Sequence, residues 1–354
     1  MNNFFLKIIL SPFPLLYGLI VMLRNIMFDL HILPQKSFKI PIIGVGNLNV
    51  GGSGKTPHVE YLLRLLNSKN NIATLSRGYG RKTSGFFLAT DNSKVEEIGD
   101  EPLQMKKKYK DIIVSVDEKR SRGVKNLMQK FPALKVILLD DAFQHRYVKS
   151  GVNILLTDYY HLYSNDMMLP SGRLREFKSG AKRADIIIVT KAPAIFSPIE
   201  RRRIIEELKP KPSQAVYFSY VKYGNFVSLI DNKEIKLESK PYNILLISGI
   251  ANTIAFEEYL KRQCEELLLN KFPDHYQFTT KDVENLRKTF VDLFPKNKII
   301  VTTEKDAMRL KQPAFLEILK DLPIYYIPIE IEFHNEDKKE FDNQILTFVK
   351  TFEK

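Results

Sequence analysis

The stretch Asn49-Val50-Gly51-Gly52-Ser53-Gly54-Lys55-Thr56 directly follows an apolar run at residues 42–45 that is typical of a buried strand. Its small residues allow successive backbone N–H groups to surround phosphate oxygens. Lys55 can reach the terminal phosphates, and the Thr56 hydroxyl can bind Mg²⁺. Asn49 stands where the usual pattern has Gly, and Asn tolerates left-handed backbone geometry. A helix follows, because Pro57 suits a first turn and apolar residues recur at helical spacing: Val59, Leu62, Leu63 and Leu66.

We therefore predict a strand, a phosphate-binding loop at residues 49–56 and an amphipathic helix, with a nucleoside triphosphate as the ligand. A Gly-rich turn that only connects strand to helix is the alternative.

A second motif supports a nucleoside triphosphate as the ligand. The apolar residues 136–139 end in Asp140 and Asp141, as when a buried parallel strand delivers carboxylates to the edge of a sheet. One of the two carboxylates would hold Mg²⁺, although a strand that ends in a solvated acidic turn has the same pattern.

Composition limits the compartment and the partners. The chain of 354 residues is 44% hydrophobic and has one cysteine, Cys264, so an internal disulfide is impossible and a reducing compartment with ATP is expected. Its 54 Lys and Arg against 41 Asp and Glu give a net charge of +13, which favours an anionic partner. Without a recognisable nucleic-acid-binding pattern, we expect no nucleic-acid partner, and no obligate protein partner is evident.

The amino terminus predicts a lipid partner. Residues 8–23 include no charged side chain, but the run is short for a spanning helix and includes Pro12 and Pro14. We predict an interfacial or shallowly inserted helix. A secretory signal and a helix packed on its own domain are the alternatives.

The rest of the chain alternates strand-like and helix-like segments, which predicts an α/β fold: a P-loop NTPase-like, doubly wound, mostly parallel sheet with a smaller second α/β domain. Residues 255–268 are expected to be helical and residues 324–331 to form one strand. The predicted order is an N-terminal membrane-associating segment at 1–40, a P-loop kinase domain at 41–212, a β linker at 213–240 and a smaller C-terminal α/β domain at 241–354.

Eight motifs together resemble the tetraacyldisaccharide 4'-kinase family of lipid A biosynthesis, and they cover nearly the whole chain. They are Val45-Gly46-Asn47 leading into Gly51-Gly52-Ser53-Gly54-Lys55-Thr56-Pro57, Leu75-Ser76-Arg77-Gly78-Tyr79-Gly80-Arg81, Gly99-Asp100-Glu101-Pro102, Asp140-Asp141-Ala142-Phe143-Gln144-His145, Leu169-Pro170-Ser171-Gly172-Arg173-Leu174-Arg175-Glu176, Ser248-Gly249-Ile250-Ala251-Asn252, Phe272-Pro273-Asp274-His275 and Thr303-Glu304-Lys305-Asp306. Two positions depart from the family pattern: Ala142 replaces Gly, and Ser171-Gly172-Arg173 replaces a small-Gly-Pro run.

The resemblance implies transfer of the γ-phosphoryl group of ATP to the 4'-hydroxyl of tetraacyldisaccharide 1-phosphate, giving lipid IVA. It places the enzyme at the cytoplasmic face of the inner membrane of a Gram-negative bacterium. It also implies that Asp100 acts with His275 on the sugar hydroxyl. Lys55 would contact the terminal phosphates, and Thr56 with Asp140 or Asp141 would support Mg²⁺, with Glu101 as a further metal contact.

Further basic and polar residues are candidates for binding substrate or nucleotide phosphates: Arg77, Arg120, Arg122, Gln144, His145 and Arg173. Rival functions are weaker. A GTPase would need a guanine-specifying Asn/Thr-Lys-x-Asp, whereas Thr190-Lys191-Ala192-Pro193 ends in Pro. A non-enzymatic membrane-binding module would not account for Lys55, Thr56 and the paired aspartates, and a soluble metabolite kinase is the closest competitor.

Overall fold

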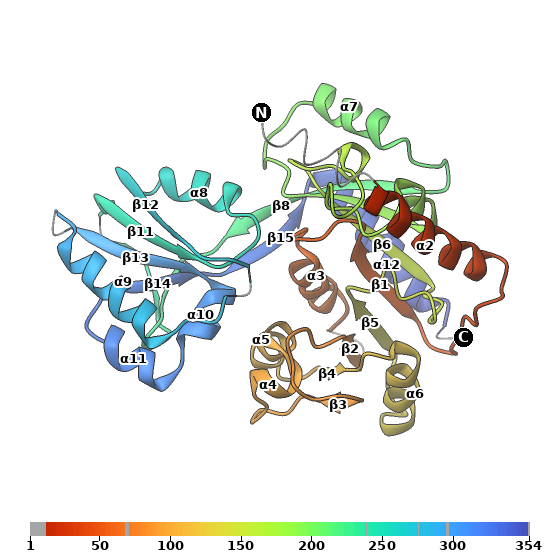
Figure 1. The fold of residues 1–354 in the computed structure, drawn as a ribbon, viewed down its shortest axis with the longest axis horizontal. Helices are drawn as coiled ribbons and strands as arrows, with labels where there is room; N and C mark the ends of the chain where they lie inside the picture. The colour runs from red at the N-terminus through yellow and green to blue at the C-terminus, as the bar shows by residue number, and fades with distance from the viewer. Residues whose placement is uncertain (1–11, 68–70, 238, 275, 295–296, 353–354) are drawn as a thin grey trace. The chain divides into compact units, whose positions relative to one another are not determined.

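The computed structural model describes residues 12–67, 71–237, 239–274, 276–294 and 297–352, so the predicted catalytic residue His275 lies outside the described residues. The chain divides into two compact units, one formed by residues 1–221 and 331–354 and the other by residues 222–330. Each unit contains one sheet (Figure 1). Apolar side chains are buried on both faces of each sheet.

The first unit is built on a nine-stranded sheet in the order β15-β8-β7-β6-β1-β5-β2-β4-β3. All neighbours from β8 to β4 pair in parallel, and β3 is antiparallel to β4. The strands are β1 (Ile42–Asn47), β2 (Ile72–Ser76), β3 (Phe87–Leu88), β4 (Ile113–Val116), β5 (Val136–Asp140), β6 (Val152–Asp158), β7 (Ile186–Thr190), β8 (Ala215–Tyr223) and β15 (Ile329–Phe333).

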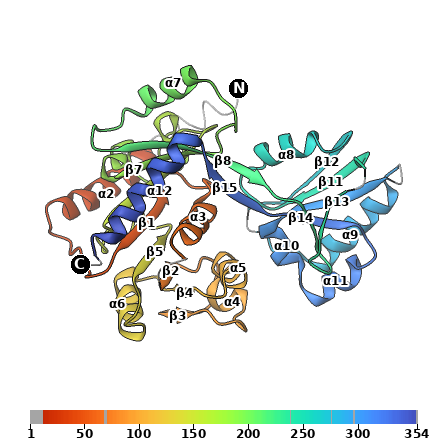
Figure 2. The ribbon, with the colours of Figure 1, turned by 180° about the vertical axis from the view of Figure 1, so that it is seen from behind.

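Helices cover both faces of this sheet, which confirms the predicted doubly wound α/β class. Ile43 and Val45 of β1 share a core with α3 and α12, whereas Ile42 faces a second core with α6. Figure 2 shows α12 running over the strands of this unit. The helices are α2 (Pro12–Asp29), α3 (Lys55–Asn67), α4 (Val95–Ile98), α5 (Asp100–Lys108), α6 (Arg120–Lys130), α7 (Pro198–Leu208) and α12 (Asn335–Lys350), with 3₁₀ turns η1 (Tyr163–Asn165) and η2 (Lys178–Arg183).

The second unit has a six-stranded sheet in the order β10-β9-β14-β13-β11-β12. Its strands are β9 (Phe226–Ser228), β10 (Glu234–Ile235), β11 (Asn243–Ser248), β12 (Glu266–Lys271), β13 (Lys298–Thr303) and β14 (Ile324–Ile327). Its helices are α8 (Ile254–Lys261), α9 (Thr280–Asp292), α10 (Glu304–Leu310) and α11 (Pro313–Leu319).

Three boundaries differ from the sequence predictions. A helix was expected at 255–268, but α8 ends at Lys261. Residues 266–268 belong instead to β12, in which the apolar Leu267 and Leu268 pair in parallel with β11. The expected single strand at 324–331 is divided into β14 and β15, with Pro328 between them, since proline has no N–H to offer a ladder. The predicted β linker at 213–240 is not a separate element, because β8 extends the first sheet and β9 and β10 belong to the second.

The carboxyl-terminal segment also differs from the predicted domain at 241–354, because residues 331–354 return to the first unit. Phe341, Ile345 and Val349 recur along α12 and enter the core that β1 and α3 share. Burial of this apolar face against the first sheet accounts for the return.

Helix α2 packs on the segments that follow β5 and η1. Phe28 is buried against the Tyr147 ring, and Asn25 donates a hydrogen bond to Glu176. Its outer face is exposed and apolar, with Leu16, Leu19, Ile20 and Leu23. Over the described part of the chain, no helix combines the length and the apolar character needed to cross a bilayer.

Candidate functional site

The predicted phosphate-binding loop connects β1 to α3. Gly51 has φ 107° and Gly54 has φ 82°, a left-handed region that favours glycine. Asn49 is not among the described non-glycine residues with positive φ, so the loop does not use the left-handed geometry that Asn tolerates. Instead its amide donates to Asp166 Oδ2 at 2.6 Å, and Val50 N donates to the Arg173 carbonyl at 2.7 Å. The loop is therefore anchored to the segment that precedes η2.

Lys55 begins α3 and turns toward the ends of β1 and β5. Its Nζ lies 3.4 Å from Asn47 Oδ1 and 3.6 Å from Asp141 Oδ1. Because β1 and β5 are neighbours in parallel, the predicted lysine and the predicted aspartates do meet at one sheet edge.

The two aspartates have different environments. Asp140 is 4% exposed and its Oδ1 has no hydrogen-bond partner. Burial, reinforced by the nearby charge of Glu101, raises the pKa of Asp140 to about 7. Asp141 accepts from Arg175 through both carboxylate oxygens, at 3.0 and 3.1 Å. Burial acts to raise the pKa of Asp141, but Lys55 and Arg175 outweigh it and lower that pKa.

Unpaired buried polar atoms gather around this edge. They are Asn47 Nδ2, Ser53 Oγ, Arg120 Nε, Asp140 Oδ1 and Gln144 Oε1. Buried polar atoms are paired in the great majority of cases, because an unpaired one keeps its full desolvation cost. A polar ligand with its water is the simplest partner for such a group.

The donor set fits Mg²⁺ held together with a nucleotide. Among the described residues, no three His, Cys, Asp or Glu side chains form a group that could hold a metal by themselves. Mg²⁺ is commonly bound through one or two carboxylates, substrate phosphates and waters, and such a site needs no protein cage. Asp140 offers an unpaired buried oxygen for this purpose, whereas both oxygens of Asp141 are held by Arg175.

Asp100, which is predicted to act on the sugar hydroxyl, and Glu101, the predicted metal contact, begin α5. Asp100 Oδ1 accepts from Glu101 N at 2.9 Å, which is a helix-start contact. Glu101 acts electrostatically on Asp140, so the start of α5 lies near the β5 end.

Three of the predicted substrate residues group beside Asp140 and Asp141. Arg120 is buried and donates to the Asp140 carbonyl at 3.4 Å. Burial lowers the pKa of the Arg120 guanidinium to about 10. The negative charges of Asp141 and Asp140 oppose this shift, and the positive charge of Arg77 adds to it. Burial, together with the positive charge of Arg120 and Arg77, lowers the pKa of His145 to about 4. At neutral pH His145 is therefore a neutral imidazole beside two guanidinium groups.

The other three predicted substrate residues have partners within the protein. Arg122 holds Asp117 through two hydrogen bonds of 2.9 and 2.8 Å and also contacts Glu118. Arg173 Nε donates to Asp166 Oδ2 at 3.1 Å. Gln144 Nε2 donates to the Asn47 carbonyl and to Glu176, each at 2.9 Å.

Sequence reasoning missed residues that complete the site. Arg175 and Glu176 end a motif quoted above, yet only structure shows that Arg175 holds Asp141 and that Glu176 is a buried acceptor for Gln144 and Arg183. Lys191 follows the buried β7, a position where strand ends deliver functional groups, and its Nζ donates to the Gly52 carbonyl at 2.5 Å.

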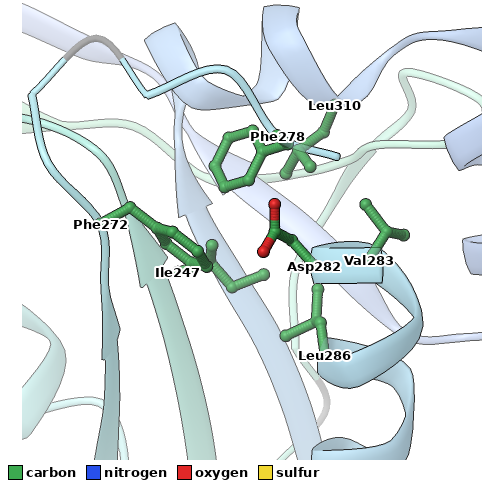
Figure 3. A pocket seen from close by; sticks show the side chains of 7 residues that line it. All are labelled: Ile247, Phe272, Phe278, Asp282, Val283, Leu286 and Leu310. Carbon is green, nitrogen blue, oxygen red and sulfur yellow. The ribbon is translucent and has the colours of Figure 1, made fainter. Parts of the chain in front are cut away.

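A small cavity of the second unit has a different character (Figure 3). The carboxylate of Asp282 faces apolar side chains there, and it accepts hydrogen bonds from Thr279 that cap α9. The apolar lining is Ile247, Phe272, Phe278, Val283, Leu286 and Leu310. This cavity shows none of the basic side chains that a phosphate ligand needs.

Comparison with known proteins identifies the family of this chain and supports its fold. A family model described as tetraacyldisaccharide-1-P 4'-kinase matches residues 6–350. The tetraacyldisaccharide 4'-kinase of Flavobacterium johnsoniae is 46% identical over 349 residues, 98% of each chain. That of Bacteroides thetaiotaomicron is 43% identical over 364 residues, covering 99% of this chain and 96% of its own. A crystal structure of LpxK from Aquifex aeolicus in complex with ATP superimposes with a TM-score of 0.72 at 28% identity, over 97% of this chain and 99% of that one.

Proposed function

The chain belongs to the tetraacyldisaccharide-1-P 4'-kinase family, and on that premise we propose that it transfers the γ-phosphoryl group of ATP to the 4'-hydroxyl of tetraacyldisaccharide 1-phosphate. The product is lipid IVA, an intermediate of lipid A biosynthesis. The observation that supports this most is the ion pair of Lys55 with Asp141, next to the buried Asp140, in a chain that matches this family over residues 6–350.

The nucleotide half of the site follows from the loop. Lys55 and the backbone N–H groups of the loop at residues 49–56, other than those of Val50 and Ser53, bind the phosphates. Asp141 and Arg175 limit where the lysine can lie. Thr56 and Asp140 would hold Mg²⁺, which when bound neutralises charge on the terminal phosphates. Asp141 orients Lys55 and Arg175 and does not bind the metal in this proposal. Of the two predicted aspartate ligands, we therefore propose Asp140.

For the acceptor half, we propose Asp100 as the group that takes the proton of the 4'-hydroxyl, with His275 as its predicted partner. The hydroxyl oxygen forms a bond to the γ-phosphorus while the bond from that phosphorus to the β,γ-bridging oxygen breaks, and ADP leaves. Arg77, Arg120 and His145 form the cationic and polar surroundings of Asp140 and Asp141, and they are the best placed of the predicted residues to bind phosphate oxygens.

The acceptor position can be tested by product analysis. After reaction with Mg-ATP and tetraacyldisaccharide 1-phosphate in detergent, the product should show a second phosphomonoester by ³¹P NMR, and fragmentation should place it on the distal glucosamine. Phosphorylation of soluble sugars or nucleosides with no change in this lipid would favour the soluble metabolite kinase instead.

Asp100→Asn should lower kcat by about 10²-fold or more, since a positioned base contributes roughly 10²- to 10⁴-fold. The dissociation constant for ATP should change little, because the substitution does not alter the loop. His275→Ala should have the same signature. Initial rates and ATP binding by each purified variant would be measured in parallel.

Asp282→Asn is the matched control, because Asp282 also lies in the first turn of a helix and accepts a backbone hydrogen bond there. It should leave kcat within twofold of the unsubstituted enzyme. A comparable loss of kcat in both variants would assign Asp100 a helix-start role only.

We further propose that α2 lies at the cytoplasmic surface of the inner membrane through its exposed apolar face, which would make the enzyme peripheral or monotopic. Replacing Leu16, Leu19, Ile20 and Leu23 with Ser leaves intact the contacts of Asn25 and Phe28 that hold the helix. The apparent KM for lipid in vesicles should rise at least fivefold, while the KM for ATP is unchanged. Val291→Ser, at an exposed apolar position of α9, serves as the control. An unchanged KM for vesicle-bound lipid in the α2 variant would argue against membrane contact by this face.

A further inference from the structure

Three consecutive carbonyl groups of the phosphate-binding loop, at residues 52–54, accept hydrogen bonds from side chains outside the loop. The contacts are Lys191 Nζ to Gly52 O at 2.5 Å, Thr190 Oγ1 to Ser53 O at 3.0 Å and His58 Nδ1 to Gly54 O at 2.7 Å. Two donors follow one another at the end of β7, and the third lies one turn into α3. The phosphate-binding function assigns no role to any of these donors.

The His58 ring is fixed from both sides. The Gly54 carbonyl can only accept, so Nδ1 bears the hydrogen, and Nε2 accepts from the Ser219 hydroxyl of β8 at 2.9 Å. Burial lowers the pKa of His58 to about 4, and the ring is neutral at pH 7 in accordance with this pairing. His58 and Ser219 are both buried, so water does not compete for these bonds.

The two donors of β7 are fixed by the neighbouring strand β6. Lys191 Nζ also contacts Asp158 Oδ2 at 2.9 Å, and the Thr190 hydroxyl lies 3.3 Å from the Thr157 carbonyl. Thr157 and Asp158 end β6, which pairs with both β7 and β1. The loop carbonyls are therefore tied to the same sheet from which the loop departs.

Fixing a carbonyl fixes the N–H of the next residue, because a trans peptide points the two in opposite directions. The Ser53 N–H donates to Gly51 O within the loop. The carbonyls held by Thr190 and His58 instead orient the N–H groups of Gly54 and Lys55, which lie at the start of α3 where an anion is favoured. A loop that already has its bound conformation loses less conformational entropy when the ligand binds, so the ligand binds more tightly.

We propose that Thr190, Lys191 and the His58–Ser219 pair are positioning residues that hold the phosphate-binding loop in its ATP-binding conformation before ATP arrives. The inference rests on the ATP-binding function proposed above. It gives β7 and β8 a part in nucleotide affinity, although their side chains need not touch the nucleotide.

Thr190→Val tests the proposal, because it keeps the shape and removes the hydroxyl. The dissociation constant of a fluorescent ATP analogue, measured by titration of the full-length protein, should rise about fivefold, as expected for one lost neutral hydrogen bond. The KM for ATP should rise with it, while the KM for lipid stays the same. For Thr190→Ser, which keeps a hydroxyl at this position, the dissociation constant of the analogue should be within twofold of that of the unsubstituted protein.

Thr302→Val is the matched control. Thr302 is fully buried on β13 and its hydroxyl donates to the Ile247 carbonyl at 2.9 Å, so the same change removes the same kind of bond in the other unit. It should lower the unfolding midpoint without changing ATP affinity.

A second pair of variants separates the two hydrogen bonds of the His58 ring. The Asn amide nitrogen corresponds to Nδ1 and the Gln amide nitrogen to Nε2, so His58→Gln should weaken ATP binding more than His58→Asn.

Unchanged ATP affinity in both Thr190→Val and His58→Gln, with normal binding by the unsubstituted protein, would overturn this inference and leave the proposed function intact. An unsubstituted protein that does not bind the analogue would overturn the proposed function and the inference with it.

Discussion

Replacing Lys55 with alanine should lower kcat for lipid phosphorylation by about 10²- to 10³-fold, the loss typical of removing one preorganised donor from developing charge. Lys55 Nζ lies between Asn47 and Asp141 at the end of β1 and is the one cation that the loop motif itself directs to the terminal phosphates. Initial rates at saturating ATP and lipid measure the effect. The loss should be concentrated in kcat because the charge on the transferred group is greatest in the transition state.

Lys125→Ala provides the control, because Lys125 is an exposed lysine of α6 and its removal changes the net charge equally. Its kcat should stay within twofold. A Lys55→Ala enzyme that retains more than a fifth of the unsubstituted kcat would contradict the assignment of residues 49–56 as the loop that binds the transferred phosphate.

Asp140→Asn should lower activity by about 100-fold or more, since a metal contributes several kcal/mol of transition-state stabilisation and each 1.36 kcal/mol corresponds to a factor of about ten. The Mg²⁺ concentration that gives half-maximal activity should rise. Rates measured across a Mg²⁺ titration at fixed ATP distinguish this from a defect in lipid binding. Full activity with an unchanged Mg²⁺ dependence would remove Asp140 from the metal site.

The same substitution should not destabilise the metal-free protein at pH 8. Burial raises the pKa of Asp140 from 3.8 to about 7, so the folded state binds more protons than the unfolded state between these values. The free energy of unfolding contributed by this group therefore falls as pH rises through that interval and stays low above it. Asparagine does not titrate, so Asp140→Asn removes this pH-dependent fall in the free energy of unfolding. The unfolding midpoint of the variant should match that of the unsubstituted protein at pH 4 and should equal or exceed it at pH 8.

Asp117→Asn provides the contrast, because Asp117 is also buried but holds Arg122 through two hydrogen bonds. Breaking that pair should lower the unfolding midpoint at pH 8. If Asp140→Asn destabilises the protein as much as Asp117→Asn does, the carboxylate of Asp140 has a structural partner after all.

The loop and the aspartate pair could be predicted from sequence because each is a local pattern: small residues before Gly54-Lys55-Thr56, and an apolar run before Asp140. The different environments of Asp140 and Asp141 could not. They depend on Arg175, which is 34 residues away in sequence and is brought to Asp141 by the segment after β6. Burial of one carboxylate and pairing of the other are properties of the folded chain only.

The fold shows the same limit. Alternation of strands and helices predicted the doubly wound sheet, but an apolar helix face does not specify which sheet it covers. The residues that form α12 were therefore included in the predicted second domain at 241–354, whereas Phe341 and Ile345 complete a core of the first unit. The apolar run at residues 267–269 is too short to indicate helix or strand by itself, and pairing of β12 with β11 decides between the two.

Transfer of label from γ-³²P-ATP into tetraacyldisaccharide 1-phosphate is the most direct test of the proposed lipid kinase activity. The unsubstituted protein with Mg²⁺ should yield labelled lipid that comigrates with lipid IVA, and Lys55→Ala and Asp140→Asn should yield about 1% of that signal or less, as the effects above require. Protein that binds ATP yet leaves this lipid unlabelled would contradict the proposed lipid kinase activity.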